Sequence, residues 1–142
     1  MQIDYLILAD AVAAVGGKHY IHGAGWDTLF VSSFPVVHPM VSIAVRLRVP
    51  WEETNQQHTV EIDVLRDEDD TSILPGPPLR GPFLVDRPAN IAPGSDQLMH
   101  MGLDLVNLHI QNPGAYTIVF RVDERVLATS KFQVISPPKP SE

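Results

Sequence analysis

The stretch Val-Ser-Ile-Ala-Val-Arg-Leu-Arg-Val at residues 41–49 gives the clearest indication of the fold. Its apolar residues occupy every odd position and alternate with Ser42, Ala44, Arg46 and Arg48. Successive side chains of a β-strand point to opposite faces. The stretch therefore predicts a strand with one buried apolar face and one wet face. Residues 59–64 and 116–122 alternate in the same way and predict two more strands.

The strand at 41–49 is expected to fold back on the strand that starts at His58. Pairing residues whose numbers add up to 107 matches the apolar and the charged faces together. The pairs are Leu47 with Val60, Val45 with Ile62, and Arg46 with Glu61. A second hairpin is predicted to turn near Asp123-Glu124-Arg125, with Val122 beside Val126 and Phe120 beside Ala128.

Earlier strands are expected at 3–8, 18–22 and 28–32. Gly16-Gly17 supplies a turn between the first two, and residues 23–25 a turn or bulge before the third. Residues 11–15 suit one helical turn, too short to be a stable helix on its own.

The segment 71–96 holds six of the 13 prolines, so it cannot be a central strand. We expect a short edge strand at 83–85 within it, the rest guarding a sheet edge or presenting a binding loop. Residues 97–111 fit either a helix or a strand with a one-residue shift. A bulged strand is favoured because Gly102 disfavours a helix by about 1 kcal/mol and suits a bulge.

Eight or nine short strands predict an all-β, two-sheet antiparallel sandwich formed by a single domain over residues 1–135. The turn Pro113-Gly114-Ala115 followed by Tyr116 resembles a corner of immunoglobulin-like domains, although the cysteine pair and core tryptophan of antibody domains are missing. The Pro-rich tail at 136–142 is predicted to be disordered.

Composition excludes several classes of protein. The chain of 142 residues has no cysteine, which rules out disulfide scaffolds and cysteine nucleophiles. Its net charge of −7, with no basic stripe, argues against nucleic acid and membrane surfaces as partners. The start of the chain does not read as a signal peptide, so a cytoplasmic location is expected.

Three stretches, YLILADAVAAVGGKHYIHGAGWDTL (5–29), VPWEETNQQHTVEIDVLRDEDD (49–70) and NPGAYTIVFRVDE (112–124), carry a resemblance. The chain resembles a family of small uncharacterised bacterial proteins of unknown function. The resemblance implies a stand-alone cytosolic β-sandwich and brings no activity or site residues with it.

Four residues are candidates for binding. Trp26 and Trp51 are the only tryptophans, and exposed on one rim they could stack on a sugar or anchor a protein. Glu52 and Glu53 follow Trp51 directly, but adjacent carboxylates rarely face each other across a cleft as glycosidases require. For both tryptophans, packing over an end of the sandwich is the favoured interpretation.

Four histidines, His19, His22, His100 and His109, raise the alternative of a metal-dependent enzyme. Residues three apart on a strand point to opposite faces, which argues against a shared ion for His19 and His22. No cofactor or metal is therefore expected. The favoured function is a non-enzymatic protein-interaction or self-assembly module that acts through sheet edges or loops; a small-ligand or carbohydrate binder that uses Trp26 or Trp51 is the first alternative.

Overall fold

The computed structural model describes residues 1–136 and 138, which form nine strands and one 3-10 turn. The strands are β1 (Gln2–Val15), β2 (Lys18–Ala24), β3 (Thr28–Phe30), β4 (Val36–Val49), β5 (Gln57–Arg66), β6 (Leu79–Leu84), β7 (Gln97–Ile110), β8 (Gly114–Val122) and β9 (Arg125–Ile135), with the turn η1 (Trp51–Glu53) between β4 and β5. The predicted all-β class is confirmed. The tail beyond residue 136 lies, apart from residue 138, outside the described residues.

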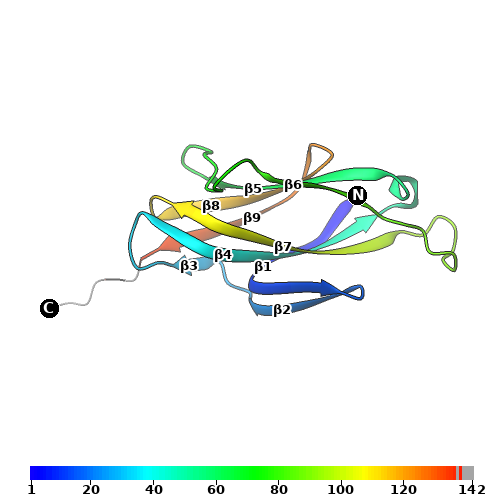
Figure 1. The fold of residues 1–142 in the computed structure, drawn as a ribbon, viewed down its shortest axis with the longest axis horizontal. Helices are drawn as coiled ribbons and strands as arrows, with labels where there is room; N and C mark the ends of the chain where they lie inside the picture. The colour runs from blue at the N-terminus through cyan, green and yellow to red at the C-terminus, as the bar shows by residue number, and fades with distance from the viewer. Residues whose placement is uncertain (137, 139–142) are drawn as a thin grey trace.

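The strands form two sheets (Figure 1). Sheet A has the order β2-β1-β4-β7 and sheet B the order β3-β9-β8-β5-β6. All pairs are antiparallel except β3 with β9. The apolar faces of both sheets share one core, whose largest fully buried side chains include Tyr116, Phe120, Phe132, Ile43 and Leu47.

Strand β7 settles the helix-or-strand question in favour of a strand. It pairs with β4 in one register from Val36↔Ile110 to Val49↔Gln97. Its buried residues lie at odd positions up to Leu105 and at even positions from Leu108. The shift falls at Asn107, whose φ of 54° lies in the left-handed region that asparagine tolerates. The expected one-residue shift after Leu105 is confirmed and falls at Asn107. The bulge expected at Gly102 is not found, because the β4–β7 register continues unchanged through that residue.

The predicted hairpin between 41–49 and the strand from His58 is wrong. β4 and β5 belong to different sheets, and η1 carries the chain from one to the other. Arg46 pairs instead with Asp4 at 3.1 Å, while Glu61 lies 3.8 Å from Arg121. Alternation marks each stretch as a strand with one buried face, but many strand pairs satisfy such a pattern equally well.

The second half of β1 pairs with β2, and this hairpin folds back against the outer face of the rest of sheet A, formed by β4 and β7 (Figure 1). Residues 11–15 are therefore strand, and the predicted helical turn there is wrong. This hairpin covers part of the outer face of β4, because Ser42 and Ala44 are fully buried although they point away from the core. That face was expected to be wet. Gly102 on β7 permits the contact, since a Cβ there would lie 3.2 Å from Val12 Cγ1.

Sheet B ends at β6, which pairs only with β5 among the described strands. The expected edge strand is thus present, at Leu79–Leu84 in place of 83–85. The β8–β9 hairpin turns at Asp123 and Glu124, both with positive φ, and Phe120 pairs with Ala128 as predicted. Val122 pairs with Arg125 and not with Val126, because the register shifts between Phe120 and Arg121. No helix among the described residues is long and apolar enough to cross a membrane.

Candidate functional site

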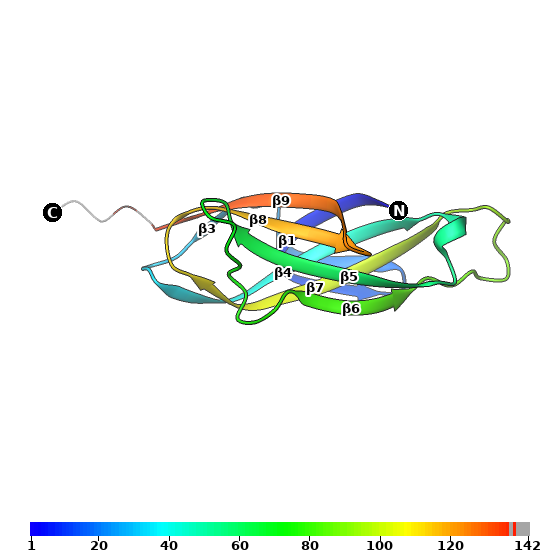
Figure 2. The ribbon, with the colours of Figure 1, turned by 90° about the horizontal axis from the view of Figure 1, so that it is seen from above.

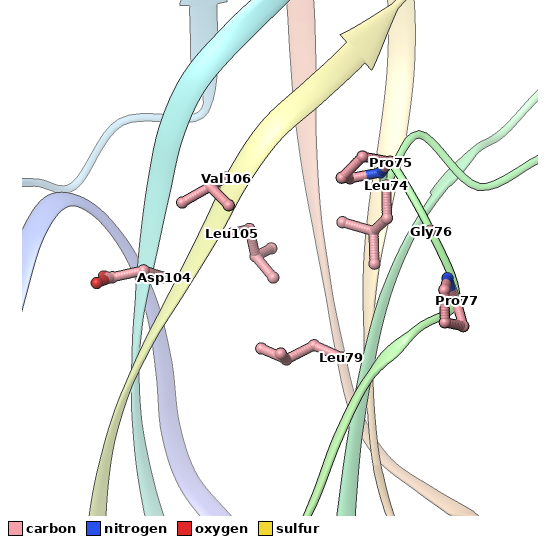
Figure 3. A pocket seen from close by; sticks show the side chains of 8 residues that line it. All are labelled: Leu74, Pro75, Gly76, Pro77, Leu79, Asp104, Leu105 and Val106. Atoms are coloured by element: carbon pink, nitrogen blue, oxygen red, sulfur yellow. The ribbon is translucent and has the colours of Figure 1, made fainter.

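The free edges of the two sheets, β6 and β7, enclose an apolar groove, which we call the edge groove. Its first hollow, of about 230 Å³, lies between β7 and the loop that precedes β6 (Figure 3). Leu74, Leu79 and Leu105 point into this hollow from three segments. The loop adds Pro75, Gly76 and Pro77 to its wall.

A second hollow of about 260 Å³ continues the edge groove along β6. Leu103 of β7 faces Gly81 of β6 across it, and Val60 and Ile62 of β5 form its floor. Leu79 borders both hollows. Leu103 and Leu105 are two residues apart on β7, so the hollows follow each other along that strand at the spacing of side chains on one face, about 7 Å.

The edge groove lies where one edge of each sheet ends on the same side of the molecule. On this side sheet A ends at β7 and sheet B ends at β6, while the β1–β2 hairpin lies at the opposite edge of sheet A. Figure 2 shows β6 as the outermost strand on this side, with β7 set inside it. The inner face of β6 is therefore buried in the core at Phe83 but borders the hollows at Leu79 and Gly81.

The backbone of β7 is open along this edge. Alternate residues of an edge strand direct N–H and C=O groups away from their sheet. Among the described residues, one backbone hydrogen bond joins β7 to a segment outside sheet A, from His109 N–H to the Ile73 carbonyl at 2.8 Å. That bond closes the groove at one end and leaves the middle of the strand available.

The Pro-rich loop that forms the outer wall is fixed to sheet B. Ser72 Oγ donates to Asp63 Oδ1 at 2.5 Å, and Ile73 N–H donates to the Val64 carbonyl at 2.9 Å. Sequence reasoning expected this segment to guard an edge or present a loop, but it did not find Leu79, Gly81, Leu103 or Leu105. The leucines Leu74 and Leu79 within a proline-rich stretch were the available signal.

Charge is absent from the floor of the groove and present at its margin. Asp104 points to the outer side of β7, where its Oδ1 accepts a hydrogen bond from Ser42 Oγ at 2.7 Å (Figure 3). Arg80 of β6 lies 3.9 Å from Glu61 on the opposite side. The groove thus offers apolar contact inside, with the Asp104 carboxylate at its β7 margin and the Arg80 guanidinium at its β6 margin.

A second polar cluster joins η1 to the β8–β9 turn around the buried His58. His58 Nδ1 lies 2.6 Å from Asp123 Oδ2, and Nε2 lies 2.7 Å from the Glu53 carbonyl. Both ring nitrogens face acceptors, so both must donate, which requires the imidazolium form. Burial lowers the pKa of His58, but Asp123 and the Glu53 carbonyl outweigh it and leave the pKa raised. This cluster is a structural tie and opens into no apolar hollow.

A third cluster anchors the β1–β2 hairpin to sheet A. His19 Nδ1 lies 2.6 Å from Tyr5 Oη, and Nε2 lies 2.9 Å from the Met101 carbonyl. The rings of His19 and His100 are 4.9 Å apart. Burial, His19 and Arg46 lower the pKa of His100. Both nitrogens of His19 are engaged, which leaves neither free to bind a metal ion.

The other histidines named from the sequence lie apart from this cluster. His22 and His109 are exposed. Within residues 1–136 and 138, no three His, Cys, Asp or Glu side chains gather in a way that could hold a metal ion.

The two tryptophans occupy separate places. Trp26 donates its indole N–H to the Gly23 carbonyl at 2.9 Å and packs edge-on against Phe132. Trp51 lies in η1 beneath the Arg87 guanidinium, 4.0 Å from the ring centroid. Because Trp51 follows the end of β4 remote from Phe132, the structure does not bring the two indoles onto one rim.

Glu52 and Glu53 follow Trp51 in the same turn. The Glu52 carbonyl accepts from Gln56, and the Glu53 carbonyl accepts from His58. The structure therefore uses the backbone of both residues to fix η1. Neither carboxylate lines the edge groove.

Among solved structures, the chain is similar to the alkylpurine DNA glycosylase AlkC of Pseudomonas fluorescens bound to DNA containing an abasic site analog. The identity is 11%, the TM-score is 0.43, and the alignment covers 94% of this chain and 30% of the glycosylase chain. A search of curated proteins gives no match. Residues 4–135 match the family of unknown function DUF6941, and the chain belongs to that family.

Proposed function

We propose that the domain is a protein-binding module that accepts an extended segment of a partner protein in the edge groove. The carrying observation is the unfilled position beside β7 and opposite the inner face of β6. An added strand would pair with the β7 backbone and place alternate side chains in the two hollows. Strand addition of this kind combines main-chain hydrogen bonds with side-chain pockets for specificity.

Exposed apolar residues support the proposal. Val106 and Leu79, at the margins of the first hollow, are 48% and 43% exposed. Edge strands of stable monomers are usually protected by charge, by proline or by a covering segment. Pro82 gives β6 such protection, whereas the middle of β7 carries apolar and small residues with a single acid, Asp104.

A different protein is a better occupant than β7 of a second copy. Two β7 strands in antiparallel pairing would be related by a twofold axis perpendicular to the sheet. Each copy would then bring its own sheet B over the position that β6 of the other copy already occupies (Figure 2). Self-assembly through β7 would require this steric conflict to be relieved.

We also propose an immunoglobulin-like relationship for the architecture. Tyr116 Oη donates to the Asn112 carbonyl at 2.5 Å, four residues upstream. A tyrosine at the start of a late strand that bonds back to the preceding loop is a feature of immunoglobulin-like sandwiches. This relationship supports binding over catalysis only by analogy, because one fold hosts many functions.

The test compares the wild-type protein with a variant whose new side chain fills part of the groove. Gly81→Leu adds a side chain where no atom lies within 4 Å of the new Cβ, so the domain should fold and the second hollow should be occupied. We expect proteins captured from a lysate of the producing organism by wild type to be lost with Gly81→Leu. The matched control is Val126→Asp on β9, a residue 53% exposed and outside both hollows, which should retain them. Equal capture by Gly81→Leu and wild type would refute the proposal.

A further inference from the structure

We infer that the segment taken up by the edge groove carries the pattern apolar–basic–apolar over three consecutive residues. This inference rests on the proposed function, because it specifies the occupant of the same groove. It draws on three features of β7: the order of Leu103, Asp104 and Leu105, the two hollows, and the side on which Asp104 lies.

The two apolar positions follow from the spacing of the hollows. Leu103 borders the second hollow and Leu105 borders the first. A strand beside β7 places one inward side chain next to each of these leucines, and these two side chains are separated by one residue. The two charged residues that line the hollows, Asp104 and Arg80, are paired with Ser42 and Glu61. The floor of Val60, Ile62 and Leu79 is apolar, so both inward side chains must be apolar to avoid an unpaired buried polar group.

The basic position follows from Asp104. The middle residue of the added tripeptide faces the outer side of sheet A, directly across from Asp104. Directly opposed side chains of opposite charge stabilise a strand pair, and like charges destabilise it. Asp104 Oδ1 accepts from Ser42 Oγ, and in the described part of the chain no hydrogen bond to Oδ2 is found. A lysine or arginine of the partner can therefore bind Oδ2 without displacing Ser42.

Two further features support a basic segment. The net charge of −7 attracts cationic segments and repels acidic ones. The pattern also reads the same in both directions, so it holds whether the added strand runs parallel or antiparallel to β7. The basic residue is accordingly the part of the pattern that distinguishes this groove from any apolar cleft.

The experiment uses three fluorescent nine-residue peptides of Thr and Ser that carry Leu-Lys-Leu, Leu-Glu-Leu or Ser-Lys-Ser at the centre. Binding to the full chain is followed by anisotropy. We expect Leu-Lys-Leu to bind about tenfold more tightly than Leu-Glu-Leu, since a favourable cross-strand pair is replaced by a like-charge pair. Ser-Lys-Ser should not bind measurably.

Variants of Asp104 test the basic position. Asp104→Lys should reverse the preference to Leu-Glu-Leu, and Asp104→Asn, which keeps an acceptor for Ser42, should abolish it. The control Glu124→Lys makes the same change of charge in the β8–β9 turn and should leave the preference as in wild type.

The outcomes separate the inference from the proposed function. Equal affinity for the Lys and Glu peptides, with both lost in Gly81→Leu, would overturn the basic position and retain the groove as a strand-binding site. No binding of any peptide, or binding that Gly81→Leu leaves intact, would overturn both. Reversal by Asp104→Lys together with loss in Gly81→Leu supports both.

Discussion

The outer face of sheet A and its free edge at β7 present similar surfaces but are treated differently by the chain. On the outer face, the β1–β2 hairpin folds back over the buried Ser42 and Ala44 and passes close to Gly102. At the edge, Leu103, Leu105 and Val106 border hollows that no described segment fills. The chain therefore supplies its own cover for one surface and leaves the hollows at the other uncovered.

The β1–β2 hairpin and a strand added at β7 would also be held in place by different interactions. The hairpin is fixed by side chains, with His19 bonded to Tyr5 and to the Met101 carbonyl and with Val12 packed on Gly102. An added strand at β7 would be held first by backbone hydrogen bonds. Cover from within the chain can depend on particular side chains, whereas strand addition imposes fewer demands on the sequence of the partner.

A matched pair of glycine substitutions gives the largest expected contrast in stability. Gly102→Leu should destabilise the domain by about 1–3 kcal/mol, because its Cβ meets Val12 at 3.2 Å and overpacking forces the hairpin to move. Gly81→Leu should change stability by less than about 0.5 kcal/mol, because its Cβ meets no atom within 4 Å. Urea unfolding of both variants measures the difference. Equal destabilisation would mean that the groove is not open.

Acid should loosen the hairpin before the rest of the fold. The folded-state pKa of His100 is lowered, so the folded state favours the neutral ring. The stability contributed by the neutral ring is present above the unfolded-state pKa of about 6.5 and is lost as the pH falls below it. Protonation places a charge on His100 beside His19 and Arg46, while Tyr5 holds the far side of His19. We expect the protection factors of the amides in residues 10–24, which correct for the pH dependence of intrinsic exchange, to fall several-fold from pH 7 to pH 5.5 relative to those of β8.

The control for this prediction is His100→Asn, which removes the titrating group and should remove most of the loss of protection. His58 serves as an internal contrast, because its raised pKa makes its contribution fully present below about pH 6.5 and progressively lost as the pH rises through the folded-state value. A uniform loss of protection across both sheets on acidification would contradict a local role for His100.

The positions of the strands could be predicted from the sequence far better than the pairing between strands. Alternation at 41–49, 59–64 and 116–122 identified three core strands and their buried faces, and the proline content of 71–96 identified an edge. The predicted hairpin between β4 and β5 was wrong because many pairs of strands with alternating apolar and polar residues match each other equally well. Arg46 and Glu61 were expected to pair with each other, but Arg46 pairs with Asp4 and Glu61 lies near Arg121.

The candidate site was largely hidden from the sequence for a related reason. Leu79 and Leu103 are far apart in the chain and are brought to one groove only because one edge of each sheet ends on the same side of the molecule. On this side sheet A ends at β7 while sheet B continues to β6, and nothing in the alternation of either strand marks it as an edge. Gly102 was interpreted as a bulge, since a glycine in a strand gives the same signal for a bulge as for a close approach of another segment.

The smallest expected effect is on stability at the uncovered edge itself. Val106→Asp should change the free energy of unfolding by no more than about 0.5 kcal/mol, as should Val126→Asp, because the two valines are 48% and 53% exposed. Only Val106 lines the groove, so only Val106→Asp should weaken binding of the Leu-Lys-Leu peptide. Thermal unfolding and anisotropy of the two variants measure both quantities. If Val106→Asp instead cost as much stability as Gly102→Leu, Val106 would have to be covered within the monomer, and the edge of β7 would belong with the outer face as a surface that the chain covers itself.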